Sequence, residues 1–320
     1  MIIDCHVHAS ALHPSRGKVS DRVTKSFPFK FMSWRLGIKY NADRQGEVEA
    51  EFEQRLFDLL DQTPELDAAA VLAFDATYDR EGRLDDARTH LYVKNDYVID
   101  LARRHRKILF AASVHPYRKD AVAEVERCVK AGAVLLKWLP IVQDIDPSDS
   151  RCFEFYECLA HHKLPLLSHT GGEKMLPNMN ADVKDPRLLA EAIRRGVTVI
   201  AAHCGTKSAL FEKDYVDEFC RMARDHEHFY GDTAALSLPT RSHAYKALFA
   251  HPEVMAKVIH GSDWPVIPIP PVTQLGLGAT AEMLHEKNWL RRDVLIKQRL
   301  GFGREYWERA AKVLRLPGAS

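Results

Sequence analysis

Short apolar runs alternate with amphipathic stretches along almost the whole chain. Eight runs are recognisable, and each is apolar on both faces, as parallel strands covered by helices must be. The runs are Met1–Cys5, Ala68–Phe74, Ile108–Val114, Ala133–Leu136, Leu164–Leu167, Val197–Ala202, a weaker one near His228–Gly231, and Val258–Ile259. The pattern therefore predicts eight buried strands.

The segments between the runs carry helical signals. Apolar residues recur at helical spacing in residues 47–62, and Gly132 follows a second such stretch at the place of a helix C-terminus. Asp185 and Pro186 are typical of a helix start, and Gly196 of the end of the same helix. Strands that alternate with helices indicate βαβ units and a parallel sheet.

Eight such units in 320 residues favour a closed (β/α)8 barrel, or TIM barrel. A doubly wound open sheet is the alternative, but no glycine-rich fingerprint follows any predicted strand. No linker divides the chain, so residues 1–320 are expected to form one domain. Two segments are extra to the plan: an insertion over residues 9–46, and helices over residues 279–320 that are expected to cover the barrel exterior.

The insertion contains the aromatic stretch Phe27–Arg35. So many aromatic residues are not expected in a surface loop that has no packing or binding role. It is interpreted as a lid over the barrel or a contact in a homo-oligomer, with contact to a flat or acidic substrate as an equal alternative.

Composition restricts the function. The chain is 46% hydrophobic and 28% charged with a net charge of +1, which excludes wholesale disorder and gives no footprint for nucleic acid or an anionic membrane. No apolar run is long enough to span a bilayer, and Asp4 interrupts any secretory leader. The six cysteines form no CxxC pair, which favours a reducing, cytoplasmic setting. We expect a small-molecule substrate.

The string Asp4-Cys5-His6-Val7-His8 stands at the end of the first predicted strand. Because side chains alternate along a strand, Asp4, His6 and His8 are expected to share one face. Two imidazoles two residues apart suit a divalent metal ion.

Further polar residues follow later predicted strands. Lys137 and His203 come directly after the fourth and sixth runs, and His169 and Asp263 follow the fifth and eighth runs within four residues. The carboxyl ends of barrel strands form the catalytic mouth, so these side chains are expected to converge there. The sequence therefore predicts a metal site at this rim.

This pattern resembles the amidohydrolase superfamily, with HxH on strand 1, a lysine or glutamate on strand 4, histidines on strands 5 and 6, and an aspartate on strand 8. Two motifs, SHTGG around His169 and HGSDWP around Asp263, are most similar to those of the amidohydrolase-2 branch. This branch includes aminocarboxymuconate-semialdehyde decarboxylase-like enzymes. The resemblance implies that the metal is held by His6, His8, His169 and Asp263. It also implies that His203 is a second ligand or a catalytic acid/base.

Lys137 is open to three interpretations. In the related binuclear hydrolases a strand-4 lysine is carbamylated and bridges two metals. An unmodified lysine would instead bind a substrate carboxylate as a point charge. The third interpretation is a lysine that faces outward between helices, which strand alternation disfavours.

The ligand set is expected to hold one or two ions, Zn²⁺ first and Mn²⁺ as the alternative. With Asp263 as general base and His203 as its catalytic partner, the first hypothesis is hydrolysis of an amide, lactone or related carbonyl bond. The second is non-oxidative decarboxylation of an aromatic or unsaturated carboxylic acid. A catalytically silent binding barrel is the third, although no ligand is missing.

The remaining histidines carry weaker signals. His115 follows the third strand and is a candidate substrate contact, and Arg241 and His243 follow the seventh strand within reach of the mouth. His260 has the opposite parity to Asp263 and is expected to be a satisfied packing residue.

Overall fold

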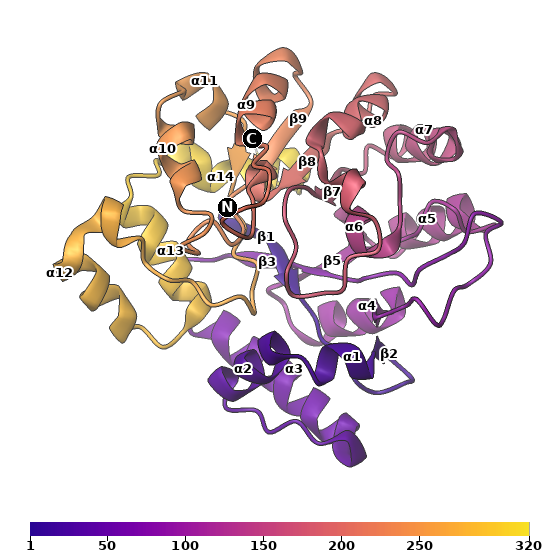
Figure 1. Cartoon of the computed structure of the whole chain (residues 1–320), viewed down its shortest axis with the longest axis horizontal. Coiled ribbons are helices and arrows are strands. Elements are labelled where there is room, and N and C mark those ends of the chain that lie inside the picture. The colour runs from indigo at the N-terminus through magenta and orange to yellow at the C-terminus, as the bar shows by residue number, and fades with distance from the viewer. Residues whose placement is uncertain (320) are drawn as a thin grey trace.

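The computed structural model describes residues 1–319, and its centre is a sheet of eight parallel strands surrounded by helices (Figure 1). The strands follow each other around the sheet in chain order: β1 (Ile3–His8), β3 (Ala68–Leu72), β5 (Ile108–Ala112), β6 (Leu135–Trp138), β7 (Leu166–His169), β8 (Val199–Ala202), β9 (Phe229–Asp232) and β10 (Val258–Ile259). The eight predicted runs are these strands, although β1 begins and ends later than its run.

The first and last strands meet and close the sheet. The backbone N–H of Cys5 donates to the carbonyl of His260 at 3.0 Å, and that of His8 donates to Trp264 at 2.8 Å. The predicted TIM barrel is therefore confirmed.

Residues on each strand alternate between two buried apolar clusters. One cluster lies inside the barrel and includes Ile3, Leu135 and Ile200. The other lies between strands and helices and includes residues adjacent in sequence to these, such as Leu136 and Val199. Both faces are apolar because both are covered, which is why the strands appear as continuous apolar runs.

Helices and single turns connect the strands. They are α3 (Gln45–Asp61), α4 (Asn95–Arg104), α5 (Ala121–Lys130), α6 (Pro140–Gln143), η2 (Ser150–Cys152), α7 (Phe153–His161), η3 (Ala181–Lys184), η4 (Pro186–Leu189), α8 (Ala190–Arg194), η5 (His203–Gly205), α9 (Val216–Asp225), α10 (His243–Phe249) and α11 (Pro252–Met255). The predicted boundaries hold. Asp185 accepts from the N–H of Arg187 at the start of η4, and Gly132 and Gly196 take positive φ after α5 and α8.

The insertion after β1 folds as β2 (Gly17–Val19), α1 (Asp21–Thr24), α2 (Phe27–Leu36) and η1 (Ala42–Arg44), and β2 pairs with β4 (Leu91–Val93). The aromatic stretch is a helix. Ser26 accepts from the N–H of Phe29 and begins α2, Pro28 stands in its first turn, and Gly37 ends it at φ 75°. In Figure 1 this indigo group lies to one side of the barrel beside α3.

The C-terminal segment forms α12 (Val272–His285), α13 (Trp289–Arg299) and α14 (Arg304–Val313). Its helical character was predicted, but the expectation that all of it covers the barrel exterior is wrong for α14. Ala310, Ala311 and Leu314 belong to the same buried cluster as Ile3 and Ala68, which stand at the starts of their strands. Because small residues let a helix approach closely, α14 seals the amino end of the barrel.

No helix within residues 1–319 combines the length and apolar character needed to cross a bilayer.

Candidate metal centre and active site

A bulge in β1 decides which side chains enter the barrel. Asp4 pairs with Ala69 and His8 with Leu72, so β1 holds one more residue than β3 over this interval. Ala69 belongs to the outer cluster and Leu72 to the inner one. The expectation that Asp4 shares a face with His8 is therefore wrong, because the extra residue reverses the alternation.

His6, His8 and Asp263 come together at the carboxyl end of the barrel. Oδ1 of Asp263 lies 3.2 Å from Nε2 of His6 and 3.0 Å from Nε2 of His8. One possible ligand atom from each of these three residues lies within 4.8 Å of the other two. Asp263 has φ 66°, a left-handed conformation that costs energy in a non-glycine residue and that recurs at functional sites. The backbone N–H of Asp263 donates to the carbonyl of His6 at 2.9 Å, and this hydrogen bond holds the left-handed conformation.

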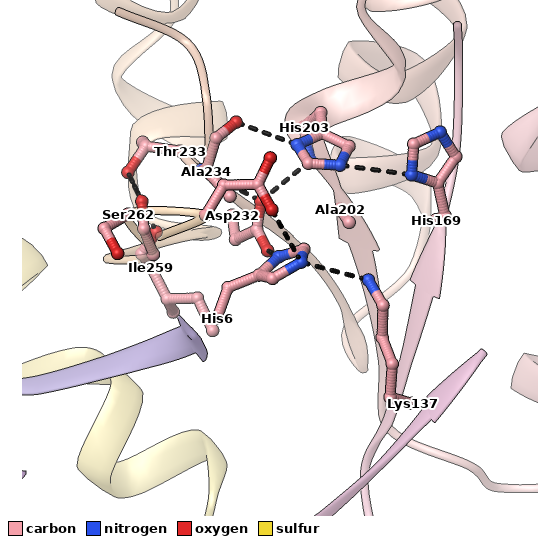
Figure 2. Close-up of polar contacts among 12 residues, drawn as sticks. His6, Lys137, His169, Ala202, His203, Asp232, Thr233, Ala234, Ile259 and Ser262 are labelled. Atoms are coloured by element: carbon pink, nitrogen blue, oxygen red, sulfur yellow. Dashed lines mark hydrogen bonds and ion pairs between the residues drawn. The ribbon is translucent and has the colours of Figure 1, made fainter. Parts of the chain in front are cut away.

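Asp232, at the end of β9, orients His6. Its Oδ2 lies 2.7 Å from Nδ1 of His6, and its Oδ1 accepts from the backbone N–H groups of His203 and Ala234 (Figure 2). A carboxylate on Nδ1 holds the ring in the tautomer whose Nε2 lone pair is free for a metal. Sequence reasoning missed Asp232, although it directly follows the weak seventh run.

Lys137 is buried, with 1% of its surface exposed, so the outward-facing interpretation is wrong. Figure 2 shows the side chain reaching from β6 towards His6, and its Nζ lies 3.1 Å from Nε2 of that ring. Burial lowers the pKa of Lys137, and the nearby carboxylates of Asp232 and Asp263 oppose that shift. Both the carbamate and the substrate-cation interpretations place the lysine here.

His169 and His203 form a pair beside the first group. Nε2 of His203 lies 3.2 Å from Nδ1 of His169, and Nδ1 of His203 lies 2.8 Å from the carbonyl of Ala234 (Figure 2). The imidazoles of His6 and His203 are 5.2 Å apart between ring centroids. The two histidines therefore line the same space, but neither belongs to the tight group of three donors. His203, like Asp263, has a positive φ, of 60°.

Burial sets the protonation of the site. Desolvation lowers the pKa of His6, His169 and His203 well below the ordinary value, so these rings are neutral at pH 7 and have lone pairs to offer. Burial alone would raise the pKa of Asp263, but His6 and His8 outweigh it and bring that pKa below its ordinary value. The site thus combines neutral imidazoles with an ionised carboxylate, as metal ligation requires.

The loops after β7 and β8 lie directly against each other. A side chain at Gly171 would place its Cβ 2.1 Å from the carbonyl oxygen of Thr206, which explains a glycine at this place. Arg241 ties the loops together, since its guanidinium donates to the carbonyl of Gly172 and to Oγ1 of Thr206, each at 2.6 Å. Arg241 was predicted within reach of the site, and it acts on the loop that follows His169.

Two other candidates lie elsewhere. His115 is fully buried, and its Nε2 donates to the carbonyl of Gln143 at 2.9 Å. It does not line the pocket that contains His6, His8 and Asp263, so the expectation of substrate contact is wrong. His243 forms a partly exposed pair with Asp214 and does not line the pocket either.

A pocket of about 160 Å³ opens above the donors. Its polar end is formed by His6, His8, Lys137, His169, Glu173, His203 and Asp263. Over the rest of its surface apolar side chains dominate, and α2 provides Phe29, Met32 and Leu36. The opposite face of α2 exposes Phe27 and Trp34, so the aromatic segment both covers the site and presents rings to the surface.

Histidine and carboxylate donors at the carboxyl rim of a parallel barrel place the chain among the metal-dependent barrel enzymes. A family model described as amidohydrolase matches residues 3–287, and the chain belongs to this family of metal-dependent enzymes that act on small molecules. The resemblance drawn from the sequence is thereby confirmed. No curated protein sequence matches the chain.

Solved structures share the fold at low identity. An uncharacterised TIM-barrel protein from Bordetella bronchiseptica is 15% identical with a TM-score of 0.59, over 94% of this chain and 99% of that one. A probable 2-pyrone-4,6-dicarboxylic acid hydrolase from Acinetobacter baumannii is 13% identical with a TM-score of 0.58, over 98% and 99%. A dihydroxybenzoic acid decarboxylase from Polaromonas, with bound manganese, is 14% identical with a TM-score of 0.53, over 98% and 97%. The neighbours thus include both reaction types.

Proposed function

We propose that the chain is a metal-dependent hydrolase that cleaves an amide, lactone or related carbonyl bond in a small molecule. The observation that supports this most is the position of Lys137, whose Nζ approaches His6 inside the donor group. In the related binuclear hydrolases, a lysine at this strand end is carbamylated and bridges two metals. An unmodified ammonium would repel a cation here, whereas a carbamate would bind it.

The residues fit a divalent ion. Two imidazole nitrogens and a carboxylate oxygen face one another, and Asp232 leaves Nε2 of His6 without a proton. His6, His8 and Asp263 would hold the first ion, with His169 and His203 beside it. A second ion would require carbamylated Lys137. We propose Zn²⁺, with Mn²⁺ as the alternative, because this ligand set suits both. The ion would supply positive charge that lowers the pKa of bound water.

The chain's own groups would then move the protons. Asp263 is ionised and close to both imidazoles, so it is the group that takes a proton from the attacking water and returns it to the leaving group. In His203, Nδ1 donates to the carbonyl of Ala234, which leaves Nε2 to accept a proton. His203 is therefore proposed as an acid/base that starts as an acceptor.

Decarboxylation is the second candidate, and the apolar pocket favours it. A carboxylate held beside Lys137, with the apolar lining excluding water from the rest of the pocket, loses part of its hydration, which favours release of neutral CO2 when another group binds the charge that develops. An unmodified Lys137 would pair with that carboxylate.

A metal-replete activity screen with mass-spectrometric readout tests these proposals. The panel contains amides, lactones and ring carboxylic acids, and each reaction is repeated after chelation. Gain of one water supports the hydrolase, and loss of one CO2 supports the decarboxylase. Turnover that is unchanged by complete metal removal would contradict both.

We also propose that residues 1–320 act as one catalytic domain in the cytoplasm. The cysteines within residues 1–319 are all free, and five of the six are buried, which suits a reducing compartment.

A further inference from the structure

The charges around the pocket are distributed unevenly. Among the residues 1–319, Lys137 is the one lysine or arginine that lines it, and it stands at the polar end. Two acids, Asp263 and Glu173, stand at the same end. Arg241 lies behind this wall with its guanidinium committed to Gly172 and Thr206.

Glu173 makes the polar end less receptive to anions. Its Oε1 accepts from the backbone N–H of Leu176 at 3.0 Å and also from that of Met175, and its Oε2 lies 4.0 Å from Nδ1 of His169. Burial raises the pKa of Glu173. Ionised, this side chain repels a substrate carboxylate, and protonated, it still supplies no positive charge.

The far end of the pocket has, among the described residues, no positively charged group that could pair with a substrate carboxylate. Phe29, Met32 and Leu36 of α2 form one wall, and Phe52 of α3 and Leu176 stand among the others. The lining there includes two hydroxyl side chains, those of Ser10 and Ser33, and no ionisable group. A carboxylate placed against this surface would lose its hydration without gaining a cation.

We propose that the site selects a small ring compound with one acidic group at most, and that it discriminates against dicarboxylic acids. This inference rests on the proposed function, and it names the substrate class of the same site. The acidic or carbonyl group is held at the end of Lys137 and Asp263, and the uncharged ring lies under α2. Met32 and Phe29 are specificity-determining residues. A volume of about 160 Å³ is close to that of cavities of roughly 150 Å³ that admit benzene, so it accommodates one ring.

The inference separates this chain from one of its structural neighbours by chemistry. A 2-pyrone-4,6-dicarboxylic acid, the compound after which the Acinetobacter baumannii protein is named, has two carboxylates on one ring. The polar end, through a bound divalent ion or an unmodified Lys137, can hold one of them, and the second would meet the apolar wall.

Calorimetric titration with two probes of the same ring tests the inference. Metal-loaded protein is titrated with benzoate and with benzene-1,3-dicarboxylate. We expect benzoate to bind at least about tenfold more tightly, because the second carboxylate is desolvated without a partner. Equal or tighter binding of the dicarboxylate would overturn the proposal, and so would failure of both rings to bind up to their solubility.

A charge placed on α2 sharpens the test. Met32→Lys adds a cation to the pocket wall and is expected to reduce the preference for benzoate by at least about tenfold. Phe31→Lys is the matched control, since Phe31 is on the same helix but exposed and outside the lining, and the preference should not change. The same loss in both variants would show a long-range charge effect and would overturn the role of Met32.

The two proposals fail separately. Binding selectivity is measured without turnover, so a selective protein with no hydrolysis or decarboxylation would contradict the proposed reaction alone. A metal-dependent hydrolase that binds both probes equally would contradict the inference alone.

Discussion

Two buried polar clusters lie on opposite faces of β1 and of the segment after β10. The inner cluster consists of His6, His8, Lys137 and Asp263, inside the barrel mouth. The outer cluster consists of Asp4, His260, Asp293 and Lys297, between the barrel and α13 and α14. The outer cluster is fully enclosed, whereas the inner cluster lines the pocket and the side chain of His8 is 27% exposed.

The outer cluster contains its own cation at its centre. Nζ of Lys297 donates to the carbonyl of Gly261 at 2.7 Å and to the carboxylate of Asp293, and Asp293 also accepts from Oγ of Ser237 at 3.2 Å. The inner cluster also contains a lysine, but Nζ of Lys137 lies 3.1 Å from Nε2 of His6 and forms no ion pair with a carboxylate among the described residues. Two imidazole nitrogens and a carboxylate oxygen lie close to one another there. Removal of one partner from a buried ion pair destabilises the fold, whereas converging acceptors suit a bound cation.

Part of the outer cluster remains unpaired. Oδ2 of Asp4 and Nε2 of His260 have no hydrogen-bond partner within residues 1–319, and they lie 4.0 Å apart. The expectation that His260 is fully satisfied is therefore wrong. Oδ1 of Asp4 accepts from Ser262 at 2.9 Å and from His6 at 3.1 Å, so Asp4 joins the two strand ends that provide the inner cluster.

The largest expected effect is in the inner cluster. Asp263→Asn removes the general base and one metal ligand, and kcat is expected to fall about 10³-fold or more. The variant should remain folded by circular dichroism, because Asp263 makes no contact with the outer cluster. A near-normal rate in metal-replete buffer would remove Asp263 from this role.

Substitutions in the outer cluster are expected to change the stability of the fold rather than kcat. Lys297→Met leaves Asp293 buried without a cation, and the free energy of unfolding is expected to fall by about 3–5 kcal/mol in urea denaturation. Metal content per folded molecule should not change. The double variant Lys297→Met with Asp293→Leu removes both charges and should recover more than half of the loss. If the double variant is as unstable as the single one, charge compensation is not the cause.

A smaller effect is expected at Asp232. Asp232→Asn weakens the hold on Nδ1 of His6, and metal affinity should fall about 10- to 100-fold in competition with a chelator. Asp75→Asn is the control, because Asp75 is also a buried carboxylate near a strand end but pairs with Arg118. Equal losses in the two variants would contradict an orienting role.

The smallest effect concerns a histidine outside both clusters. Burial lowers the pKa of His115 to about 4, whereas an unfolded histidine titrates near 6.5. Between these values the unfolded chain binds a proton that the folded chain does not, so the free energy of unfolding falls as the pH decreases from about 6.5 to about 4. His115→Gln lacks this dependence, so its stability difference from the natural chain should narrow at low pH. A difference that is constant between pH 7 and pH 4.5 would contradict this assignment.

The sequence alone determined the strands, the barrel and the rim on which the candidate residues lie. Strands covered on both faces must be apolar throughout, so runs such as Ile108–Val114 and Val197–Ala202 are visible without any tertiary information. Lys137 and His203 directly follow such runs, and His169 and Asp263 come within four residues of the ends of theirs. The carboxyl ends of barrel strands share one rim, so their convergence was predictable.

Only the tertiary structure decided which side chains meet. The bulge in β1 depends on pairing with β3, and it sends Asp4 outward and His8 inward although simple alternation gives them one face. Asp232 follows a run too weak to attract attention, and its role exists only through its contact with His6. The apolar wall of the pocket comes from α2, a helix that the insertion places over a distant strand end. Local periodicity describes one element at a time, whereas these features arise from contacts between elements far apart in the chain.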